Sequence, residues 1–287
     1  MNKILIPTDF ADQSFPMIDY GVNLAYSMHL GVRLFFCLDI SKFTAPYFHF
    51  ELNDLPCDLN DYSEVYENVG ERCYQYIKRT KKKYGNDFQI DYVAGSGWYA
   101  NQVLEMVRES GINILLIHGK KKYGFIDRLV QNAESIMIDN AMCHIWVVPP
   151  EYDFKCLRKI LFITDSEDWD EPVLDKIHIW TTFFGASLEV LNITQEARVG
   201  KSSKFSDMSF EFLDEEVSLN RINQYLLEGQ FDLLVIVRKE NCYLKEVLSK
   251  KEFKKLVFKT RLPLLLYQQE DKVADSFREK KCRRIKA

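Results

Sequence analysis

The chain has 287 residues, 47% of them hydrophobic, and a formal net charge of −4 at pH 7. This length predicts about two domains, each large enough for an ordinary packed core. The slightly acidic balance argues against a dedicated nucleic-acid binder, and no run of about 18 apolar residues predicts a membrane-spanning helix.

The chain begins almost directly with an apolar run, without the basic segment and cleavage site of a signal peptide, so a cytoplasmic location is expected. Seven cysteines are present, an odd number, and none forms a CxxC pair. Neither a disulfide framework nor a metal site is therefore predicted. Cys37 and Cys143 stand in or beside apolar runs and are interpreted as small hydrophobic residues.

The first half alternates short apolar runs with segments of helical spacing. Strands are predicted at 3–7, 32–40, 88–93, 112–117 and 145–148. Helices are predicted at 14–29, 62–84, 99–109 and 125–141.

Several residues mark the ends of these elements. Ser14 is predicted to cap the first helix, with Pro16 in its first turn, and Gly31 is predicted to end it. The sequence GSG at 95–97 is predicted to close the third strand. Residues 43–61 are aromatic, acidic and irregular, and they are interpreted as a long loop.

The second half follows the same order with fewer elements. Strands are predicted at 159–163, 187–193, 208–213, 232–237 and 263–267. Helices are predicted at 170–183, 215–229 and 242–260. Residues 195–206 are polar and predict a flexible link.

Strands that alternate with helices indicate an open, doubly wound parallel sheet of the α/β class. Because the pattern occurs twice, two Rossmann-like domains of five strands each are predicted, at 1–150 and 157–270. Residues 271–287 form a charged tail, for which a frayed structure is expected.

The two halves are also similar in sequence. KILIPTD at 3–9 returns as KILFITD at 159–165, and CHIWVVPP at 143–150 corresponds to LPLLLYQQ at 262–269. The offset is 156 at the first block (159 − 3) and 119 at the last (262 − 143). The second copy therefore lacks about 35 residues, which correspond to the second helix and its connections.

The chain shares several features with a known family: the opening KILIPTDF, Gly31, Gly95, the segment IHGKKKYG at 117–124 and the aliphatic fifth strand. In these features the chain resembles the tandem universal stress proteins. The resemblance implies an open α/β fold related to adenine-nucleotide hydrolases. It also implies that the two halves pair with each other in place of a homodimer. Members that bind ATP have an acidic residue after the first strand, then Gly-x-x-Gly, nine residues, and Gly-Ser or Gly-Thr before the last helix.

The resemblance assigns candidate cofactor-binding residues to the first half only. Two positions keep the pattern, Asp9 and Gly119, whereas Lys122 stands where the second glycine belongs, with Gly124 two positions later. Asn132 and Ala133 replace the Gly-Ser pair. Glycines allow backbone N–H groups to approach phosphates, so their loss indicates a degenerate site. In the second half Asp165 remains, but Arg238 and Asn241 replace the two loop glycines.

For several residues two interpretations stay open. Asp9 either holds a nucleotide or caps the following turn, and the lysines at 120–122 either attract an anion or are solvated. Trp98 and Tyr99 either shape a pocket or pack. His118 and His144 border buried strands and are interpreted as core or edge histidines.

No Ser-His-Asp order, nucleophile elbow, HExxH motif or Walker loop is present, so no catalytic residues and no enzymatic activity are predicted. The expected function is a non-enzymatic cytoplasmic stress-response or signalling protein whose halves form a pseudo-dimer. The alternative is a weak sensor of adenine nucleotides or other small anions. No cofactor is expected, although ATP or AMP is possible in the first half. Partners are the paired domains, other proteins or further copies, without nucleic acid or membrane.

Overall fold

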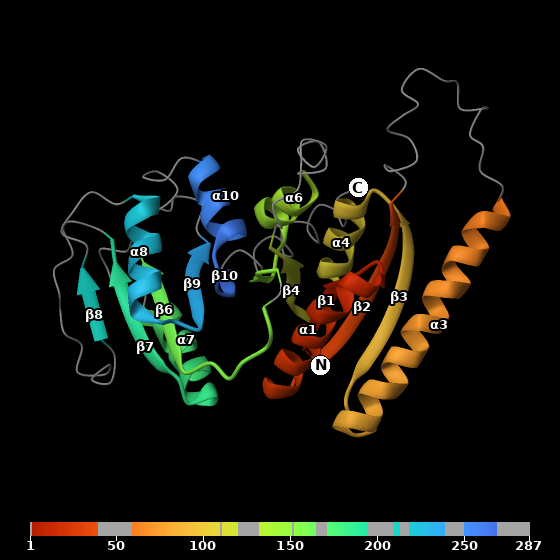
Figure 1. Ribbon diagram of the computed structural model, residues 1–287, viewed down its shortest axis with the longest axis horizontal. Coiled ribbons are helices and arrows are strands. Elements are labelled where there is room, and N and C mark those ends of the chain that lie inside the picture. The colour runs from red at the N-terminus through yellow and green to blue at the C-terminus, as the bar shows by residue number, and fades with distance from the viewer. Residues whose placement is uncertain are drawn as a thin grey trace, which may run out of the picture. The chain divides into compact units, whose positions relative to one another are not determined.

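The computed structural model describes residues 2–39, 59–109, 111–119, 132–150, 152–164, 171–193, 209–212, 218–238 and 250–268 (Figure 1). The chain forms two compact units. Unit 1 contains Met1–Ile117 and Lys122–Cys143, and unit 2 contains His118–Lys121 and His144–Ala287. Within the described residues, no helix is long and apolar enough to cross a membrane.

Unit 1 is built on four strands in the order β3-β2-β1-β4. They are β1 (Lys3–Pro7), β2 (Gly31–Asp39), β3 (Ile90–Gly97) and β4 (Ile112–His118), whose last residue is grouped with unit 2. All three neighbouring pairs are parallel. The helical elements are η1 (Asp12–Ser14), α1 (Phe15–Ser27), α3 (Leu59–Tyr84), α4 (Tyr99–Arg108) and α6 (Asn132–Asn140).

Helices cover both faces of this sheet, as a doubly wound fold requires. Helices α1 and α3 lie on one face, where Phe36 of β2 packs edge to face on Tyr66 of α3 at 5.8 Å. Phe15 of α1 stacks on Tyr76 of α3 at 5.7 Å, which joins the two helices. Helix α4 lies on the opposite face, where the Met106 sulfur is 3.9 Å from the Arg33 guanidinium of β2.

Two element ends differ from the sequence prediction. Gly31 does not end α1; it is the first residue of β2, and the left-handed residue after the helix is His29 with φ 52°. Glycine is favoured at 31 because an added Cβ would lie 3.2 Å from the Gln89 carbonyl oxygen, a tight contact. The GSG sequence does not close β3 either, since Gly95 to Gly97 pair in register with Cys37 to Asp39.

Unit 2 has six strands in the order β5-β10-β9-β6-β7-β8. They are β5 (His144–Val148), β6 (Lys159–Thr164), β7 (Ser187–Asn192), β8 (Ser209–Phe212), β9 (Leu233–Arg238) and β10 (Leu264–Gln268). Its helices are α7 (Glu171–Phe184), α8 (Leu219–Gly229) and α10 (Lys250–Lys259).

The strand that ends the first sequence repeat is part of this second unit. β5 pairs with β10 in antiparallel orientation, with Trp146 opposite Leu265, both fully buried. His144 accepts a hydrogen bond at Nδ1 from the backbone N–H of Gln268 at 3.0 Å. The other pairs in unit 2 are parallel, so the predicted α/β class with a mainly parallel sheet is confirmed.

The described part of unit 2 contains no helix between β7 and β8, where unit 1 has α3 between β2 and β3. The predicted loop at 43–61 lies outside the described residues up to 58, and its last three residues belong to α3. The link at 195–206, the tail at 271–287 and the predicted helical residues 125–131 and 242–249 also lie outside the described residues.

Candidate functional site

The turn after β1 carries the first candidate residue, Asp9, at the carboxyl end of the strand. Thr8 is buried and donates its backbone N–H to the Phe35 carbonyl at 2.8 Å, which holds the turn on β2. Phe10 adopts a left-handed backbone with φ 55°, and its N–H is satisfied by the Thr8 hydroxyl at 3.0 Å. Its ring is 1% exposed, so this uncommon backbone conformation is fixed by burial. Asp9 between them is exposed.

Asp9 organises the approach to α1. Its Oδ1 accepts hydrogen bonds from the Ala11 N–H at 2.9 Å and from the Ser14 hydroxyl at 2.6 Å. Ser14 stands at the N-cap position of α1, as predicted, but its side chain makes no capping hydrogen bond. The Ser14 hydroxyl donates to Asp9 instead. Asp9 Oδ2 makes no hydrogen bond to the described residues, which leaves one carboxylate oxygen open to solvent.

Gly119 follows β4 and is buried. Its N–H donates to the Val148 carbonyl at the end of β5, with a nitrogen–oxygen distance of 2.6 Å. An added Cβ would lie 3.0 Å from that same oxygen and 3.2 Å from the Pro149 Cα. Contact with β5 therefore favours a glycine here, and the backbone N–H of Gly119 is already used within the protein.

The remaining predicted residues are only partly described. Lys122 and Gly124 lie outside the described residues, and Asn132 is the first residue of α6, with its side chain also outside them. Ala133 lies half-buried in the first turn of α6, followed there by Glu134. A carboxylate in the first turn favours the helix N-terminus and disfavours a second anion beside it. Asp9 and Ala133 belong to unit 1 and Gly119 to unit 2. In the second half, Asp165, Asn241 and the side chain of Arg238 also lie outside the described residues.

A group of polar side chains between α3 and β3 was missed by sequence analysis. Tyr92 has a buried hydroxyl without a hydrogen-bond partner among the described residues, and burial raises its pKa to about 12. Its ring packs edge to face on Phe10 at 5.9 Å. Tyr66 donates to the Gly95 carbonyl at 3.0 Å, and burial raises the pKa of the Cys73 thiol to about 12. A thiol with so high a pKa is not a nucleophile at neutral pH.

The carboxyl end of β3 presents an aromatic side chain to solvent. Trp98 follows Gly97, whose φ of 141° requires glycine, and the indole is 56% exposed. Trp98 is therefore not part of the buried core. Within the described residues, no group of three or more His, Cys, Asp and Glu side chains could hold a metal ion.

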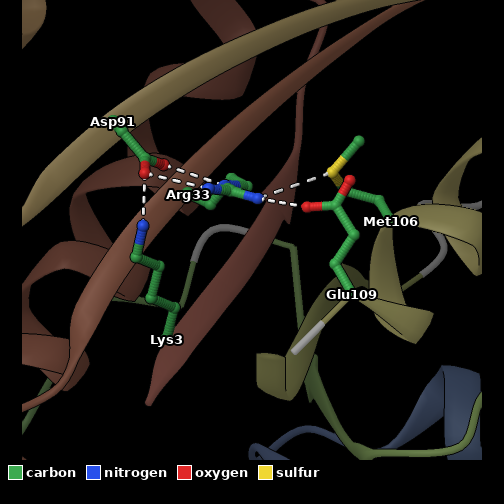
Figure 2. A network of polar contacts seen from close by, with 5 residues as sticks. All are labelled: Lys3, Arg33, Asp91, Met106 and Glu109. Carbon is green, nitrogen blue, oxygen red and sulfur yellow. Dashed lines mark hydrogen bonds and ion pairs between the residues drawn. The ribbon is translucent and has the colours of Figure 1, made fainter. Parts of the chain in front are cut away.

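A network of charged side chains lies at the other, amino ends of the strands (Figure 2). Asp91 of β3 accepts from Lys3 of β1 and, through both oxygens, from Arg33 of β2, which also pairs with Glu109 at 2.5 Å. Burial alone raises the pKa of Asp91, but the hydrogen bonds from Arg33 and Lys3 outweigh it and lower the pKa. Because every charge in this network has a partner, it ties strands together and does not form a ligand site.

The fold defines a protein of the α/β class with a mainly parallel sheet, and two of the candidate residues, Asp9 and Gly119, follow the strands β1 and β4. No protein-family model matches the chain. A universal stress protein of Methanocaldococcus jannaschii is 23% identical over 148 residues, which cover 51% of this chain and 81% of that protein. The chain is therefore homologous to a universal stress protein over about half its length.

Solved structures with the same fold cover nearly the whole chain. A universal stress protein from Archaeoglobus fulgidus superposes with a TM-score of 0.67, at 10% identity over 94% of this chain and 97% of that one. A protein of unknown function from Pseudomonas aeruginosa gives a TM-score of 0.57, at 10% identity over 96% and 95%. At such identities the likeness concerns the fold alone.

Proposed function

We propose that the protein is a non-enzymatic stress-response or signalling protein of the universal stress type, located in the cytoplasm. The observation that carries this proposal is that two candidate nucleotide-binding groups serve the fold. Asp9 Oδ1 accepts two hydrogen bonds from the turn before α1, and the Gly119 N–H donates to Val148. A backbone N–H that is already paired within the protein does not stabilise a phosphate.

We further propose that the two halves, at 1–150 and 157–270, act as a pseudo-dimer in which each half contributes its final strand. The antiparallel pairing of β5 with β10 supports this arrangement, because these are the last strands of the two sequence repeats. The pairing places apolar side chains such as Trp146 and Leu265 away from water and covers one edge of each strand. A pair of domains held in this way presents surfaces to other proteins and needs no catalytic residue.

A second candidate function is weak binding of an adenine nucleotide or another small anion by the first half. The open Oδ2 of Asp9 favours it, since in parallel sheets ligands bind beyond the carboxyl ends of the strands. The exposed Trp98 at the end of β3 adds a flat surface on which a base could stack.

Isothermal titration calorimetry of the full chain with ATP and AMP separates the two functions. We expect no saturable heat at about millimolar nucleotide, because the one described N–H of the candidate loop, that of Gly119, is already paired with Val148. Saturable binding that Asp9→Ala abolishes would contradict the main proposal and support the second. Ser14→Ala is the matched control, because it removes a hydrogen bond of the same turn but leaves the Asp9 carboxylate in place.

A further inference from the structure

Helix α3 has one face on the sheet and one face in solvent. The face on the sheet contains Val69, Cys73, Tyr76 and Thr80, all buried. The solvent face carries residues that are three or four positions apart and therefore form one line along the helix. We name this line the α3 stripe: Glu67, Glu71, Tyr74, Lys78, Lys81 and Lys82. Lys81 is half-buried and the others are exposed.

Charge is segregated along the α3 stripe. Two carboxylates, Glu67 and Glu71, precede Tyr74, and only lysines follow it. Tyr74 is 59% exposed. Within the part of the chain that the structure describes, no residue of the stripe forms an ion pair, and Glu71 accepts a single hydrogen bond from Gln75 at 2.6 Å.

The helix itself does not explain this pattern. The dipole of a helix favours acidic residues in its first turn and basic residues in its last, which accounts for Lys81 and Lys82 but not for Glu67, Glu71 or Lys78. Glu67 and Glu71 are four positions apart and carry like charges, as do Lys78 and Lys82. Such pairs disfavour an isolated helix, whereas an acidic residue four positions before a lysine would favour it.

We propose that the α3 stripe is an interface for a second copy of this chain. Two α3 helices that cross antiparallel about a twofold axis at Tyr74 bring opposite charges together on both sides. Glu67 then faces Lys81 and Lys82 of the other copy, and Glu71 faces its Lys78. The two Tyr74 rings meet at the axis, where exposed aromatic side chains supply apolar contact area. A surface that is complementary to itself under a twofold rotation is what an isologous dimer requires.

This interface is independent of the proposed function and of the pairing of β5 with β10. It lies on α3 beside β3, the end strand of the order in unit 1 (Figure 1). One helix pair buries less than the roughly 1,200 Å² typical of stable complexes, so the dimer is weak. Its contacts are exposed ion pairs, so salt weakens it further.

Sedimentation velocity of the full chain over a concentration series tests this interface. We expect a dimer at about 20 mM salt whose dissociation constant rises about tenfold or more at about 500 mM, because the Debye length falls well below the width of the interface. A chain that stays monomeric at low salt up to about 100 μM would overturn the proposal.

A charge exchange then identifies the surface. Variant A carries Lys78→Glu and Lys82→Glu, and variant B carries Glu67→Lys and Glu71→Lys. Variant B alone presents only basic charges to its copy, and variant A presents four carboxylates with Lys81 as the one remaining cation of the stripe, so we expect each to be monomeric. In an equal mixture, the acidic stripe of A faces the basic stripe of B, and we expect a dimer of A with B. Dimers of A alone or B alone, or a mixture that stays monomeric, would overturn the proposal.

The matched control reverses two cations beside the stripe, in Arg79→Glu with Lys83→Glu. It has the same change in net charge and the same spacing on α3 as variant A. Lys83 lies over the Tyr84 ring at 4.7 Å, and it forms no ion pair within the described residues. We expect it to dimerise like the unmodified chain; equal loss in control and variant A would show a general charge effect and overturn the proposal. Circular dichroism verifies the fold of each variant. Tyr74→Ala, at an exposed position, is a second test of the interface. It should raise the dissociation constant of the dimer about tenfold, and an unchanged dissociation constant would contradict the proposed axis.

Discussion

Lys3 and Lys159 occupy the same place in the two halves of the chain, as the first residues of β1 and β6. In the first half Lys3 pairs with Asp91, which stands two strands away on β3 (Figure 2). In the second half Lys159 pairs with Glu189 on the neighbouring strand β7 at 3.0 Å. The lysine is common to both repeats, but the residue that neutralises it comes from a different strand.

The registers of the two sheets show how this difference arises. Arg33 is aligned with Leu5, and Glu189 is aligned with Leu161, so both stand at the same place relative to the opening strand. That place holds a cation in the first half and an anion in the second. The cation in the first half shares the Asp91 carboxylate with Lys3, whereas the anion in the second contacts Lys159 directly. The first lysine of each half is therefore neutralised by a carboxylate, Asp91 in the first half and Glu189 in the second.

The two arrangements also differ in burial. The Asp91 side chain is 39% exposed, whereas the Glu189 side chain is 11% exposed. Water screens the first and largely leaves the second unscreened, so an uncompensated charge costs more free energy in the second half. Mutations at these two carboxylates should therefore have unequal effects.

Glu189→Ala should give the largest loss of stability. It removes the partner of Lys159 and the acceptor of the Tyr225 hydroxyl, which lies 2.5 Å from Glu189 Oε1. We expect the free energy of unfolding to fall by about 2 to 3 kcal/mol, measured by urea unfolding followed by circular dichroism. Glu189→Gln keeps an acceptor for Tyr225 and should lose about half as much. An alanine variant as stable as the unmodified chain would contradict the importance of burial at this pair.

Asp91→Asn should have a smaller effect, about 1 kcal/mol at pH 7, because its partners Lys3 and Arg33 keep contact with water. The pKa of Asp91 is lowered in the folded state. Its stabilising contribution is thus fully present above the unfolded pKa near about 4 and is lost as the pH falls through the folded pKa.

Urea unfolding of both proteins as a function of pH checks this sign. The unmodified chain and Asp91→Asn should differ at neutral pH and converge in acid. Glu109→Gln is the control: it removes only one contact of Arg33 and leaves Asp91 paired, so its effect should be smaller at every pH. A difference that grows on acidification would mean that the carboxylate destabilises the folded state.

The sequence predicted strands and helices well where periodic apolar residues determine them. The opening strands, α1, α4 and all five strands of the second half lie within a few residues of their predicted positions. The ends were less accurate: the left-handed residue after α1 is His29, and Gly95 to Gly97 belong to β3 because they pair with Cys37 to Asp39 of β2. The ion pairs Lys3–Asp91 and Lys159–Glu189 could not be predicted from the sequence, because they depend on the register of the strands in the sheet.

The hydrogen bonds of the candidate residues could not be read from the sequence. Asp9 and Gly119 lie at the ends of β1 and β4, as the resemblance implies. A glycine that contacts phosphate and one that contacts a neighbouring carbonyl have the same letter in a sequence. Only the distance from the Gly119 nitrogen to Val148 distinguishes them. Tyr92 was missed because its hydroxyl is buried by α3 and Phe10, which come from other parts of the chain.

Ser14→Ala tests the hydrogen bonds at the carboxyl ends of the strands, where both sequence repeats have an aspartate after the first strand. The Ser14 hydroxyl donates one hydrogen bond to Asp9 in an exposed turn, so its loss should lower the free energy of unfolding by about 0.5 kcal/mol. Asp9→Ala removes the bond from Ala11 as well and should cost about 1 kcal/mol, measured by urea unfolding of both variants.

The relative loss of unfolding free energy in these two variants shows whether Asp9 stabilises the turn after β1. If Asp9 serves the turn, both variants lose stability, and the aspartate variant loses more because its Oδ1 accepts two hydrogen bonds. If Asp9→Ala proves as stable as the unmodified chain, the carboxylate does not serve the fold, and its open Oδ2 points to the nucleotide-binding alternative. The same residue in two repeats would then be kept for a ligand in the first half, where calorimetry should detect it.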